Sequence, residues 1–543
     1  MDNRDKFFTT LITTKLSCGK NLLELTIYKD LTLWWFIDNH FQIFLERIFT
    51  KKTLVSRSQL HLIPLFRIFE LLFYYLKVFL INTIIKLIGK KSSKNKPEIR
   101  KVLIINQDIQ WKYIQDYKKK QLRKTDAFFD SIINQITGQY ELIGTYPLKG
   151  RVPIRSSRVF IEKLKSNISH FPFDRYWSIK SWREEIEAAR HFKKVWNVIK
   201  EDKIFKQLTF FEKKKLHKAI ETELEFYFSR AFPRSIRQIE MAKQLFEKET
   251  PNLVLLLNEY GFFERTFVYA GKKEKIPTIA LQHGIIHPTH YAYMINKRYK
   301  GSVLLPDITC VYGYYFRDLL VNKSVYEPKQ VVVTGSPRYD IFIHGNNLYS
   351  KEKLGKKFKT SPREKIILWA TQCQLEPYTK DLGENRKNFD AVFGTFYQLK
   401  DTLLIIKQHP GEGIVYTKMI EEYLNKYHLE ALFVPKNADT FELLYCSDLL
   451  ITKNSTTAME AIALNKPVLI LNLSGQPDIV NYVEEGVAIG VYSREKLKSA
   501  VERLLNDDSE LVANRERYIE NYLYQVDGKA TKRVVDQIDK LCA

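Results

Sequence analysis

Cysteine is scarce in this sequence, and none of it is arranged in pairs. The 543 residues contain five cysteines, scattered from one end of the chain to the other: Cys18, Cys310, Cys373, Cys446 and Cys542. Without a C-x-x-C pair, the sequence supports neither a disulfide framework nor a zinc site. This pattern fits a protein that works in a reducing, cytoplasmic compartment.

Three common phosphate-binding motifs are also missing. The sequence has no G-x-x-x-x-G-K-[ST] loop and no G-x-G-x-x-G loop, so ATP hydrolysis and dinucleotide redox chemistry lack their usual phosphate cradles. It has no D-x-D triplet, which argues against a metal-dependent phosphate site. His283, His287 and His290 have no interleaved carboxylate, and Pro288 would break a helix that aligned them. We therefore expect no metal and no cofactor.

Acidic residues are too few to balance the basic ones. The 86 lysines and arginines outnumber the 62 aspartates and glutamates, which gives a formal charge of +24. Such an excess favours anionic partners, namely nucleic acid, lipid headgroups or phosphorylated ligands. No paired Cys/His finger, aromatic RNP-like segment or long basic repeat accompanies the charge, so we expect no nucleic-acid partner.

The first predicted unit, residues 1–100, differs in composition from the rest of the chain. Its segment 62–88 is strongly apolar, but charged residues such as Lys77 interrupt it, and the basic run 90–96 follows. A central lysine costs roughly 2.5 to 3.5 kcal/mol in a spanning helix. We therefore predict a helical region that lies on the cytoplasmic face of the membrane, where Lys77, Lys86 and the basic run meet anionic headgroups. The alternative is a buried helix pair.

Alternating strand and helix patterns predict an α/β protein with parallel sheets in the rest of the chain. Short apolar runs such as 253–257 and 402–407 have the length and composition of buried strands. We expect two facing Rossmann-like domains and a closing helix, at 101–345, 346–525 and 526–543. Between the strands, the sequence indicates a loop followed by a helix at 111–126 and a loop-like linker at 351–359.

A β-α-β pattern from Ser447 to Leu471 contains a candidate ligand site. Its turn places Asn454, Ser455 and Thr456 at a helix N-terminus, where free backbone N–H groups and the helix dipole can hold a phosphate. Glu460 lies one turn into the helix, where a carboxylate can accept hydrogen bonds from ribose hydroxyls. Simple capping of the helix is the alternative explanation for these polar residues.

Two polar clusters that follow strands of the first predicted domain could supply a general base. Glu259 comes directly after the 253–257 strand, and burial would raise its pKa toward the working pH. Gln282-His283-Gly284 follows the next strand, and combines an imidazole with a glycine that allows close backbone approach. Glu259 and His283 are both candidates.

A third cluster, 407–411, follows the apolar strand residues 402–406 of the second predicted domain. Lys407 and His409 can neutralise a departing phosphate, and Pro410 with Gly411 fixes the turn that aims them. Because ligands of open α/β sheets bind at the carboxyl ends of the strands, we expect all these clusters to line one cleft.

Four of these segments occur in the order seen in a known superfamily. They are LQHG at 281–284, VTGSPRYD at 333–340, KQHPGEG at 407–413 and SDLLITKNSTTAMEAIALNKPVLIL at 447–471. Together they resemble GT-B glycosyltransferases that build microbial surface polymers: capsule Kdo transferases, bacterial polysialyltransferases and CDP-glycerol glycerophosphotransferases. The UDP-N-acetylglucosamine 2-epimerases are more distantly similar.

The resemblance implies roles for individual residues. In the sialyl and Kdo enzymes a His-Pro pair contacts the nucleotide phosphate, which implies that role for His409 and Pro410. A Ser/Thr turn completes that site, here Ser455 and Thr456, and in the epimerases a Glu similar to Glu460 holds the ribose.

The resemblance leaves the base open between two residues. The acidic base of the sialyl enzymes lies in an acidic-acidic-Gly motif, whereas this chain has Asn-Glu-Tyr-Gly around Glu259. In the glycerophosphotransferases a His similar to His283 is the favoured base. Gly335 and Arg338 of the second segment, VTGSPRYD, are expected to support the site.

The function we expect is that of a membrane-associated GT-B glycosyltransferase. It would move a sugar from a nucleotide-activated donor to a surface-polysaccharide or lipid-linked glycan acceptor, without a metal and with inversion. The alternatives are a CDP-glycerol-type glycerophosphotransferase, a 2-epimerase-like isomerase, and a non-catalytic basic scaffold on the membrane. The donor, the acceptor and the oligomeric state stay open.

Overall fold

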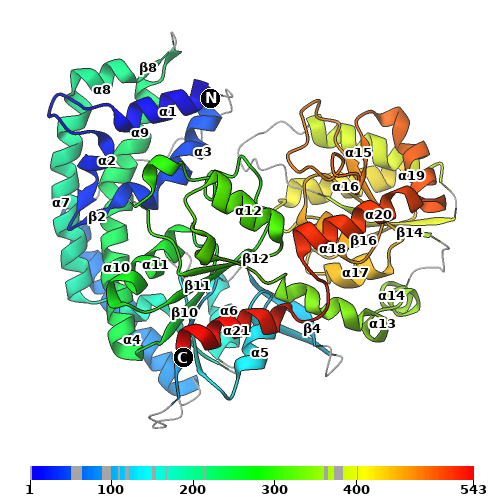
Figure 1. Ribbon diagram of the computed structural model, residues 1–543, viewed down its shortest axis with the longest axis horizontal. Coiled ribbons are helices and arrows are strands. Elements are labelled where there is room, and N and C mark those ends of the chain that lie inside the picture. The colour runs from blue at the N-terminus through cyan, green and yellow to red at the C-terminus, as the bar shows by residue number, and fades with distance from the viewer. Residues whose placement is uncertain are drawn as a thin grey trace.

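The computed structural model contains two parallel α/β sheets and a helical N-terminal region that packs on the first (Figure 1). The residues it describes are 3–49, 64–88, 99–107, 110–116, 121–148, 154–164, 166, 168–211, 214–301, 303–359, 365–371, 383–399 and 401–543. The two parallel sheets confirm the predicted α/β class.

The first sheet has seven parallel strands in the order β13-β12-β11-β10-β3-β6-β7. Helices cover both faces, which is why the central strand is buried along its whole length. The strands are β3 (Lys101–Ile105), β6 (Glu141–Tyr146), β7 (Ser169–Pro172), β10 (Leu253–Leu257), β11 (Thr278–Leu281), β12 (Ile308–Val311) and β13 (Val331–Val333). The helices between them include α5 (Asp130–Ile136), α6 (Ile154–Leu164), α11 (Phe262–Glu274) and α12 (Tyr314–Lys323).

The second sheet has six parallel strands in the order β16-β15-β14-β17-β18-β19. The strands are β14 (Lys365–Ala370), β15 (Thr402–Lys407), β16 (Ala431–Val434), β17 (Leu449–Thr452), β18 (Val468–Leu471) and β19 (Ile489–Val491). The helices are α15 (Gly383–Phe396), α16 (Ile414–Tyr427), α17 (Thr440–Cys446), α18 (Thr456–Ala463), α19 (Leu497–Asn506) and α20 (Ser509–Tyr518), followed by the short turn η9 (Ile519–Leu523). The sequence reading missed β19, which is only three residues long.

The C-terminal helix α21 (Ala530–Cys542) leaves the second sheet and packs under the first (Figure 1). Val534, Val535 and Ile538 share a buried cluster with strands β10 and β11 and with helix α5. The carboxylate of Asp340 accepts hydrogen bonds from the backbone N–H groups of Ala530 and Thr531, at 3.0 and 2.8 Å. Helix α21 therefore belongs to the first half of the molecule, although it follows the second sheet in the chain.

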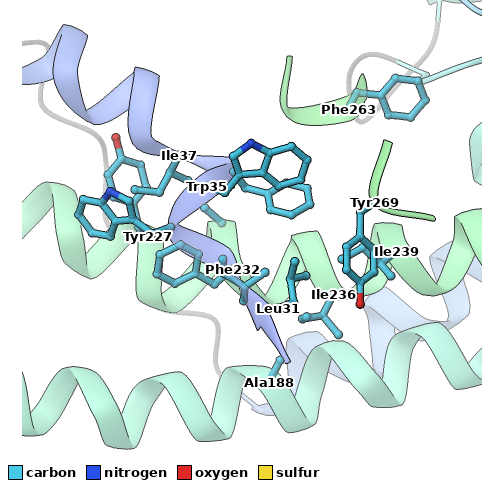
Figure 2. Close-up of a cluster of buried hydrophobic side chains, with 14 of the residues drawn as sticks. Leu31, Trp35, Ile37, Ala188, Tyr227, Phe232, Ile236, Ile239, Phe263 and Tyr269 are labelled. Atoms are coloured by element: carbon cyan, nitrogen blue, oxygen red, sulfur yellow. The ribbon is translucent and has the colours of Figure 1, made fainter. Parts of the chain in front are cut away.

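Residues 3–49 belong to the folded core of the first half. They form α1 (Asn3–Thr13), α2 (Leu22–Leu25), β1 (Ile27–Tyr28), β2 (Leu31–Thr32), η1 (Leu33–Phe36) and α3 (Asp38–Phe49). They pack against α7 (Ile179–Glu201), α8 (Lys203–Leu208), α9 (His217–Phe226), η4 (Tyr227–Ala231) and α10 (Phe232–Glu249). The short strands β8 (Phe210–Phe211) and β9 (Lys214–Lys215) come between α8 and α9 in the chain. Figure 2 shows Leu31, Trp35 and Ile37 among Tyr227 and Phe232, all buried.

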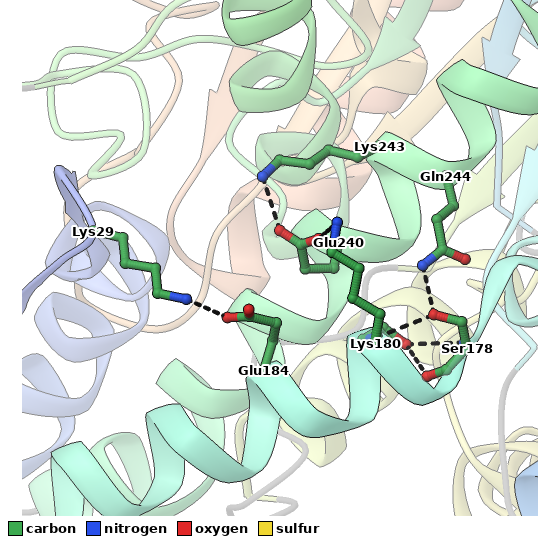
Figure 3. A network of polar contacts seen from close by, with 8 residues as sticks. Lys29, Ser178, Lys180, Glu184, Glu240, Lys243 and Gln244 are labelled. Atoms are coloured by element: carbon green, nitrogen blue, oxygen red, sulfur yellow. Dashed lines mark hydrogen bonds and ion pairs between the residues drawn. The ribbon is translucent and has the colours of Figure 1, made fainter.

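Polar contacts fix this N-terminal region and the long helices to one another (Figure 3). Lys29 pairs with Glu184 of α7 at 2.5 Å, and Gln244 of α10 donates to the Ser178 hydroxyl that caps α7. Arg265 of α11, only 1% exposed, pairs with Asp38 at 2.7 Å. The N-terminal helices are thus part of the first half and not a separate segment.

Helix α4 (Pro64–Ile88) lies on the turn η3 (Phe173–Tyr176), with Lys77 directed toward the protein and Lys86 exposed. The basic run 90–96 lies outside the described residues. Lys77 pairs with Asp174 at 2.5 Å, and Tyr74 stacks on Trp177. The expectation that Lys77 meets lipid phosphates is therefore wrong, because its ammonium is held by the protein. Within the described residues, no helix combines the length and apolarity needed to cross a membrane.

Two local predictions are wrong. Residues 111–126, expected as a loop and a helix, contain an antiparallel hairpin of β4 (Trp111–Asp116) and β5 (Gln121–Asp126). Residues 351–359, expected as a linker, form helix α14 (Lys351–Phe358), which Ser350 caps and Leu354 anchors in the core. Polar composition concealed both elements, because the hairpin depends on its partner strand and the helix on a single buried side chain.

Candidate active site

The carboxyl end of β15 supplies a buried lysine. Lys407 is 7% exposed, and its ammonium donates to the backbone oxygen of Lys436 at 3.0 Å. Burial, helped by the charge of Lys112, lowers its pKa to about 8. Lys407 is therefore a cation at neutral pH that deprotonates only slightly above it.

His409, two residues further, is held in one tautomer. Its backbone N–H donates to the Thr371 hydroxyl at 3.1 Å, and its Nδ1 accepts from the Gly411 N–H at 3.0 Å. The neutral ring must then carry its proton on Nε2. Partial burial and the charge of Lys407 lower the pKa of His409, so the ring is a neutral Nε2–H donor. Pro410 continues the turn, as expected from the sequence.

Ser455 caps helix α18, as expected if the polar residues of this turn serve to cap the helix. The Ser455 hydroxyl accepts from the Thr457 N–H at 3.2 Å and contacts the Thr457 hydroxyl at 2.9 Å. Tyr482 donates to the Ser455 carbonyl at 3.0 Å, which fixes the turn from the other side. Asn454 precedes the cap and Thr456 opens the helix. A capping role for Ser455 leaves the helix dipole directed at any anion bound there.

Arg338 and Glu460 connect the two halves of the site. Arg338 comes from η7 (Pro337–His344), directly after the first sheet, and pairs with Glu460 of α18 at 3.3 Å. The Arg338 guanidinium lies 4.8 Å from the Phe128 ring centroid and 5.1 Å from that of Phe441. Burial raises the pKa of Glu460, while Arg338 opposes the rise. Gly335, at a φ of 76°, makes the turn that leads into η7.

Lys112 of the β4–β5 hairpin is a cation that the sequence reading missed. The Lys112 side chain is exposed, but partial desolvation of its ammonium and the charge of Arg338 lower its pKa. Its own charge contributes to lowering the pKa of both Lys407 and His409. In the sequence, Lys112 is one of many basic residues in a predicted loop, so nothing marked it as a site residue. The pairing of β4 with β5 is what brings it to the site.

Cations outnumber carboxylates around Glu460. Lys112, Arg338 and Lys407 all act on its pKa, whereas Asp439 is the carboxylate that acts alongside it. Asp439 also caps α17 through the Phe441 N–H at 3.0 Å. Like charges held close together are costly, so a bound anion would relieve the repulsion. The arrangement suits a ligand with more than one phosphate.

His283 is a neutral imidazole beside these cations. Its Nδ1 is buried and has no hydrogen-bond partner among the described residues. The ring packs between Tyr260 and Phe128, and burial together with Arg338 lowers its pKa to about 4. At neutral pH the ring is unprotonated, as a general base must be.

The loop that carries His283 is fixed by Gln282 and approaches α18. The Gln282 amide donates to the Gly284 carbonyl at 2.8 Å and accepts from the Tyr312 N–H at 2.8 Å. A Cβ added to Gly284 would lie 3.9 Å from the Thr456 methyl group. The backbone after His283 therefore meets the start of α18, and the candidate base lies next to the expected phosphate site.

Glu259 lies elsewhere, in a closed network of hydroxyls. It is 4% exposed and accepts from Tyr293, Tyr326 and Thr309 at 3.1, 3.2 and 3.3 Å. Burial raises its pKa, but both carboxylate oxygens are already occupied. The sequence could not show that these three hydroxyls converge on it. Of the two candidate bases, the geometry favours His283.

The part of the chain that the structure describes contains no group of three or more His, Cys, Asp or Glu side chains placed to hold a metal ion.

Known proteins share parts of this sequence and fold. Over 226 residues, or 39% of this chain, it is 25% identical to the teichoic acid poly(ribitol-phosphate) polymerase of Bacillus spizizenii. That match spans 33% of the relative's length.

Solved structures show a loose similarity over most of the chain. UDP-GlcNAc 2-epimerase from Neisseria meningitidis, bound to UDP-GlcNAc, has a TM-score of 0.48 at 15% identity and covers 81% of this chain and 100% of its own. The wall teichoic acid polymerase TagF has a TM-score of 0.46 at 12% identity, and covers 89% and 98%.

The sequence profile of one family matches residues 182–540, more than half of the chain. That family is described as CDP-glycerol:poly(glycerophosphate) glycerophosphotransferase, and its members are transferases. The protein therefore belongs to the CDP-glycerol:poly(glycerophosphate) glycerophosphotransferase family.

Proposed function

We propose that the protein transfers a polyol phosphate from a CDP-activated donor to a hydroxyl group of a growing surface polymer. The observation that carries the proposal is the gathering of Lys112, Arg338 and Lys407 around Glu460, beside a neutral His283. Family membership supports the donor class, and the relative from Bacillus spizizenii supports glycerol or ribitol as the polyol.

The reaction is a displacement at the phosphorus that carries the polyol. His283 takes the proton of the acceptor hydroxyl, whose oxygen then bonds to that phosphorus. The bond from the phosphorus to the bridging oxygen breaks, and CMP leaves with the electron pair. His409 donates its Nε2–H to the departing phosphate, and Lys407 neutralises the charge that develops there. Such a preorganised donor is typically worth roughly 3 to 4 kcal/mol of transition-state stabilisation.

Phosphate transfer accounts for the cations better than the sugar transfer preferred on the sequence alone. In a sugar transfer the attacked atom is a carbon, and only the departing diphosphate needs neutralising. In a polyol-phosphate transfer the attacked phosphate is itself anionic and must be shielded from the incoming oxygen. Three cations can shield the anionic phosphate that is attacked as well as the one that departs. The two halves would act as the acceptor and donor domains of a GT-B arrangement.

A donor panel tests the proposal. Purified protein is incubated with CDP-glycerol, CDP-ribitol, UDP-N-acetylglucosamine and CMP-sialic acid, each with and without a glycerol phosphate oligomer as acceptor. We expect acceptor-dependent release of CMP from a CDP-polyol, and stabilisation of the protein by CDP-polyols. Acceptor-dependent release of UDP or of CMP from a sugar nucleotide, with no reaction of either CDP-polyol, would overturn it in favour of a glycosyltransferase.

We further propose that the protein works on the cytoplasmic face of the membrane, where a lipid-linked acceptor would be held. The support is the outward face of α4, on which large apolar side chains are exposed: Leu72, Phe73, Leu76, Phe79, Leu80 and Leu87. Between Leu72 and Leu80 the one charged side chain, Lys77, points to the protein instead. An apolar helix face of this kind suits insertion into the lipid interface.

A further inference from the structure

A cavity opens beside the loop that carries His283. It measures about 690 Å³ and lies between the two halves of the molecule. Its walls come from that loop, from α12, from the segment after β18 and from η9, and include Ile285, His287, Tyr315, Asp478, Tyr492 and Tyr522. None of the phosphate-site residues described above lines it.

The cavity is unusual in this basic protein because none of the described residues that line it is a lysine or an arginine. The carboxylates of Asp478 and Glu484 lie on its wall instead. Carboxylates repel phosphates and accept hydrogen bonds from hydroxyl groups. A neutral, hydroxyl-rich molecule therefore fits this cavity better than an anionic chain does.

Tyr492 gives the cavity a fixed aromatic surface. Its ring is 54% exposed, yet its hydroxyl donates to Asp478 at 2.7 Å. Asp478 is itself held by the Asn472 amide at 2.7 Å. The Tyr492 hydroxyl lies against Gly490, where any Cβ would come within 2.5 Å of it. An exposed ring held at its hydroxyl end presents one face in one orientation, at little entropic cost on binding.

The opposite wall is a stack of tyrosines that is also fixed by hydrogen bonds. Tyr522 stacks on Tyr315 at 4.3 Å and on Tyr518 at 4.1 Å between ring centroids. Its hydroxyl donates to Glu485 at 2.6 Å. Tyr522 is 3% exposed, so this stack is a rigid support, and the exposed Tyr492 ring together with the Glu484 carboxylate suits the alternating C–H and O–H faces of a sugar ring.

From this chemistry we propose that the cavity is an acceptor subsite that binds a neutral sugar ring, which places the sugar near His283. Ile285 and His287 of the wall follow His283 by two and four residues, so a sugar bound there is connected to the base by one short loop. This assignment of the acceptor class rests on the proposed function. It implies that the acceptor carries a sugar close to the hydroxyl that reacts.

The test uses Tyr492→Ala, with Tyr397→Ala as its matched control. Tyr397 is 65% exposed and lies beyond the end of α15, away from the cavity. The probes are an alkyl glycoside and an alkyl glycerol phosphate of the same chain length, observed by saturation-transfer NMR. We expect the glycoside to bind the wild type and Tyr397→Ala, with about tenfold weaker binding to Tyr492→Ala, since one stacked ring contributes on that scale.

Tyr492→Phe separates stacking from orientation, because the ring stays while its hydrogen bond to Asp478 is lost. We expect a loss smaller than that of Tyr492→Ala. Equal glycoside binding to wild type and Tyr492→Ala, or stronger binding of the glycerol phosphate to the cavity, would overturn the inference.

Steady-state kinetics can test the sugar subsite separately from the proposed function. With a sugar-bearing acceptor and CDP-glycerol, Tyr492→Ala should raise the acceptor KM about tenfold and leave the donor KM unchanged. A change in the donor KM instead would reassign the cavity to the donor and overturn the inference. If no CDP-polyol reacts while the glycoside still binds in a Tyr492-dependent way, the proposed function fails and the sugar site stands.

Discussion

Arg338 and the buried Glu460 form an ion pair, 3.3 Å between Nη1 and Oε1, that joins the segment after the first sheet to helix α18 of the second. The guanidinium also contacts the rings of Phe128 and Phe441, one from each half, so moving it would disturb contacts on both sides. This pair fixes the relative position of the base and the phosphate site. It is also where the cleft is most sensitive to substitution.

Replacing Arg338 with methionine should destabilise the protein by about 3 to 5 kcal/mol, because it leaves a buried carboxylate unpaired. Urea unfolding at neutral pH measures the loss. The double variant Arg338→Met/Glu460→Gln should recover part of it, since no buried charge remains. A double variant as unstable as Arg338→Met would show that packing against the two rings, and not charge, stabilises the junction.

The stability lost in Arg338→Met should depend on pH, and the direction of that dependence can be predicted. Burial raises the pKa of Glu460, and removing Arg338 removes the main effect that lowers it. The folded state then binds a proton more tightly than the unfolded state, so stability is gained as the pH falls. The deficit of Arg338→Met should shrink when unfolding is measured at progressively lower pH below neutrality. A deficit independent of pH would contradict this explanation.

His283→Gln should reduce acceptor-dependent turnover by about 10² to 10⁴ without weakening donor binding, because only proton transfer is lost. Glu259→Gln is the matched comparison, since it alters the other candidate base. We expect Glu259→Gln to lower the melting temperature by disturbing its three hydroxyl contacts, while folded protein retains turnover. Turnover lost in Glu259→Gln and kept in His283→Gln would reverse the assignment.

The activity should decline on both sides of a plateau in pH. With a pKa of about 4, His283 is available as a base throughout the neutral range. With a pKa of about 8, Lys407 loses its charge as the pH rises, so kcat/KM for the donor should fall above about that pH. Lys407→Arg should remove the alkaline limb, because arginine stays charged. Glu412, whose pKa is about 7, also titrates nearby, and Glu412→Gln isolates its contribution.

Lys112→Ala should weaken donor binding by about tenfold, the usual scale for one charge-assisted contact to a phosphate. Lys124→Ala is the matched control, because Lys124 lies on the same hairpin and pairs with Glu162 at 2.6 Å. Isothermal titration with CDP-glycerol at low and high salt provides the measurement. Equal effects of the two variants would mean that the hairpin acts through general charge and not through a contact.

The residues of the site differed in how far the sequence could reveal them. His283 and Lys407 follow apolar runs that are unmistakable strands, and parallel strands place their ends together. Lys112 escaped because an antiparallel hairpin depends on a partner segment that local pattern does not identify. Glu259 also follows a strand, which is a position expected of a base, but its three hydroxyl partners come from distant parts of the chain that local pattern does not identify.

The orientation of helix α4 is another feature that the sequence could not predict. Residues 64–88 form one helix whose many apolar residues give no clear amphipathic pattern, so the sequence could not show which side packs. Lys77 was the natural candidate for the exposed side. The structure turns it inward because Asp174 offers a partner there, and a lysine held by a carboxylate is less costly than an unpaired one.

The orientation of α4 leads to a sharper prediction about the membrane. Leu72, Leu76 and Phe79 are 59%, 58% and 66% exposed, and each can bury further apolar surface in lipid worth roughly 1 kcal/mol. Replacing all three with glutamine should therefore lower partitioning to anionic liposomes by about a hundredfold in flotation. Ile414→Gln/Val415→Gln is the control, since these exposed residues lie on α16 of the other half.

Lys77→Met provides the complementary test, because the inward pairing predicts an effect on folding and not on lipid binding. We expect Lys77→Met to lower the melting temperature, since Asp174 loses its partner, and to leave liposome binding unchanged. High salt should weaken binding only in part, because the apolar face does not depend on charge. Full release by Lys77→Met, with the triple variant still bound, would show that charge and not the apolar face holds the protein to the membrane.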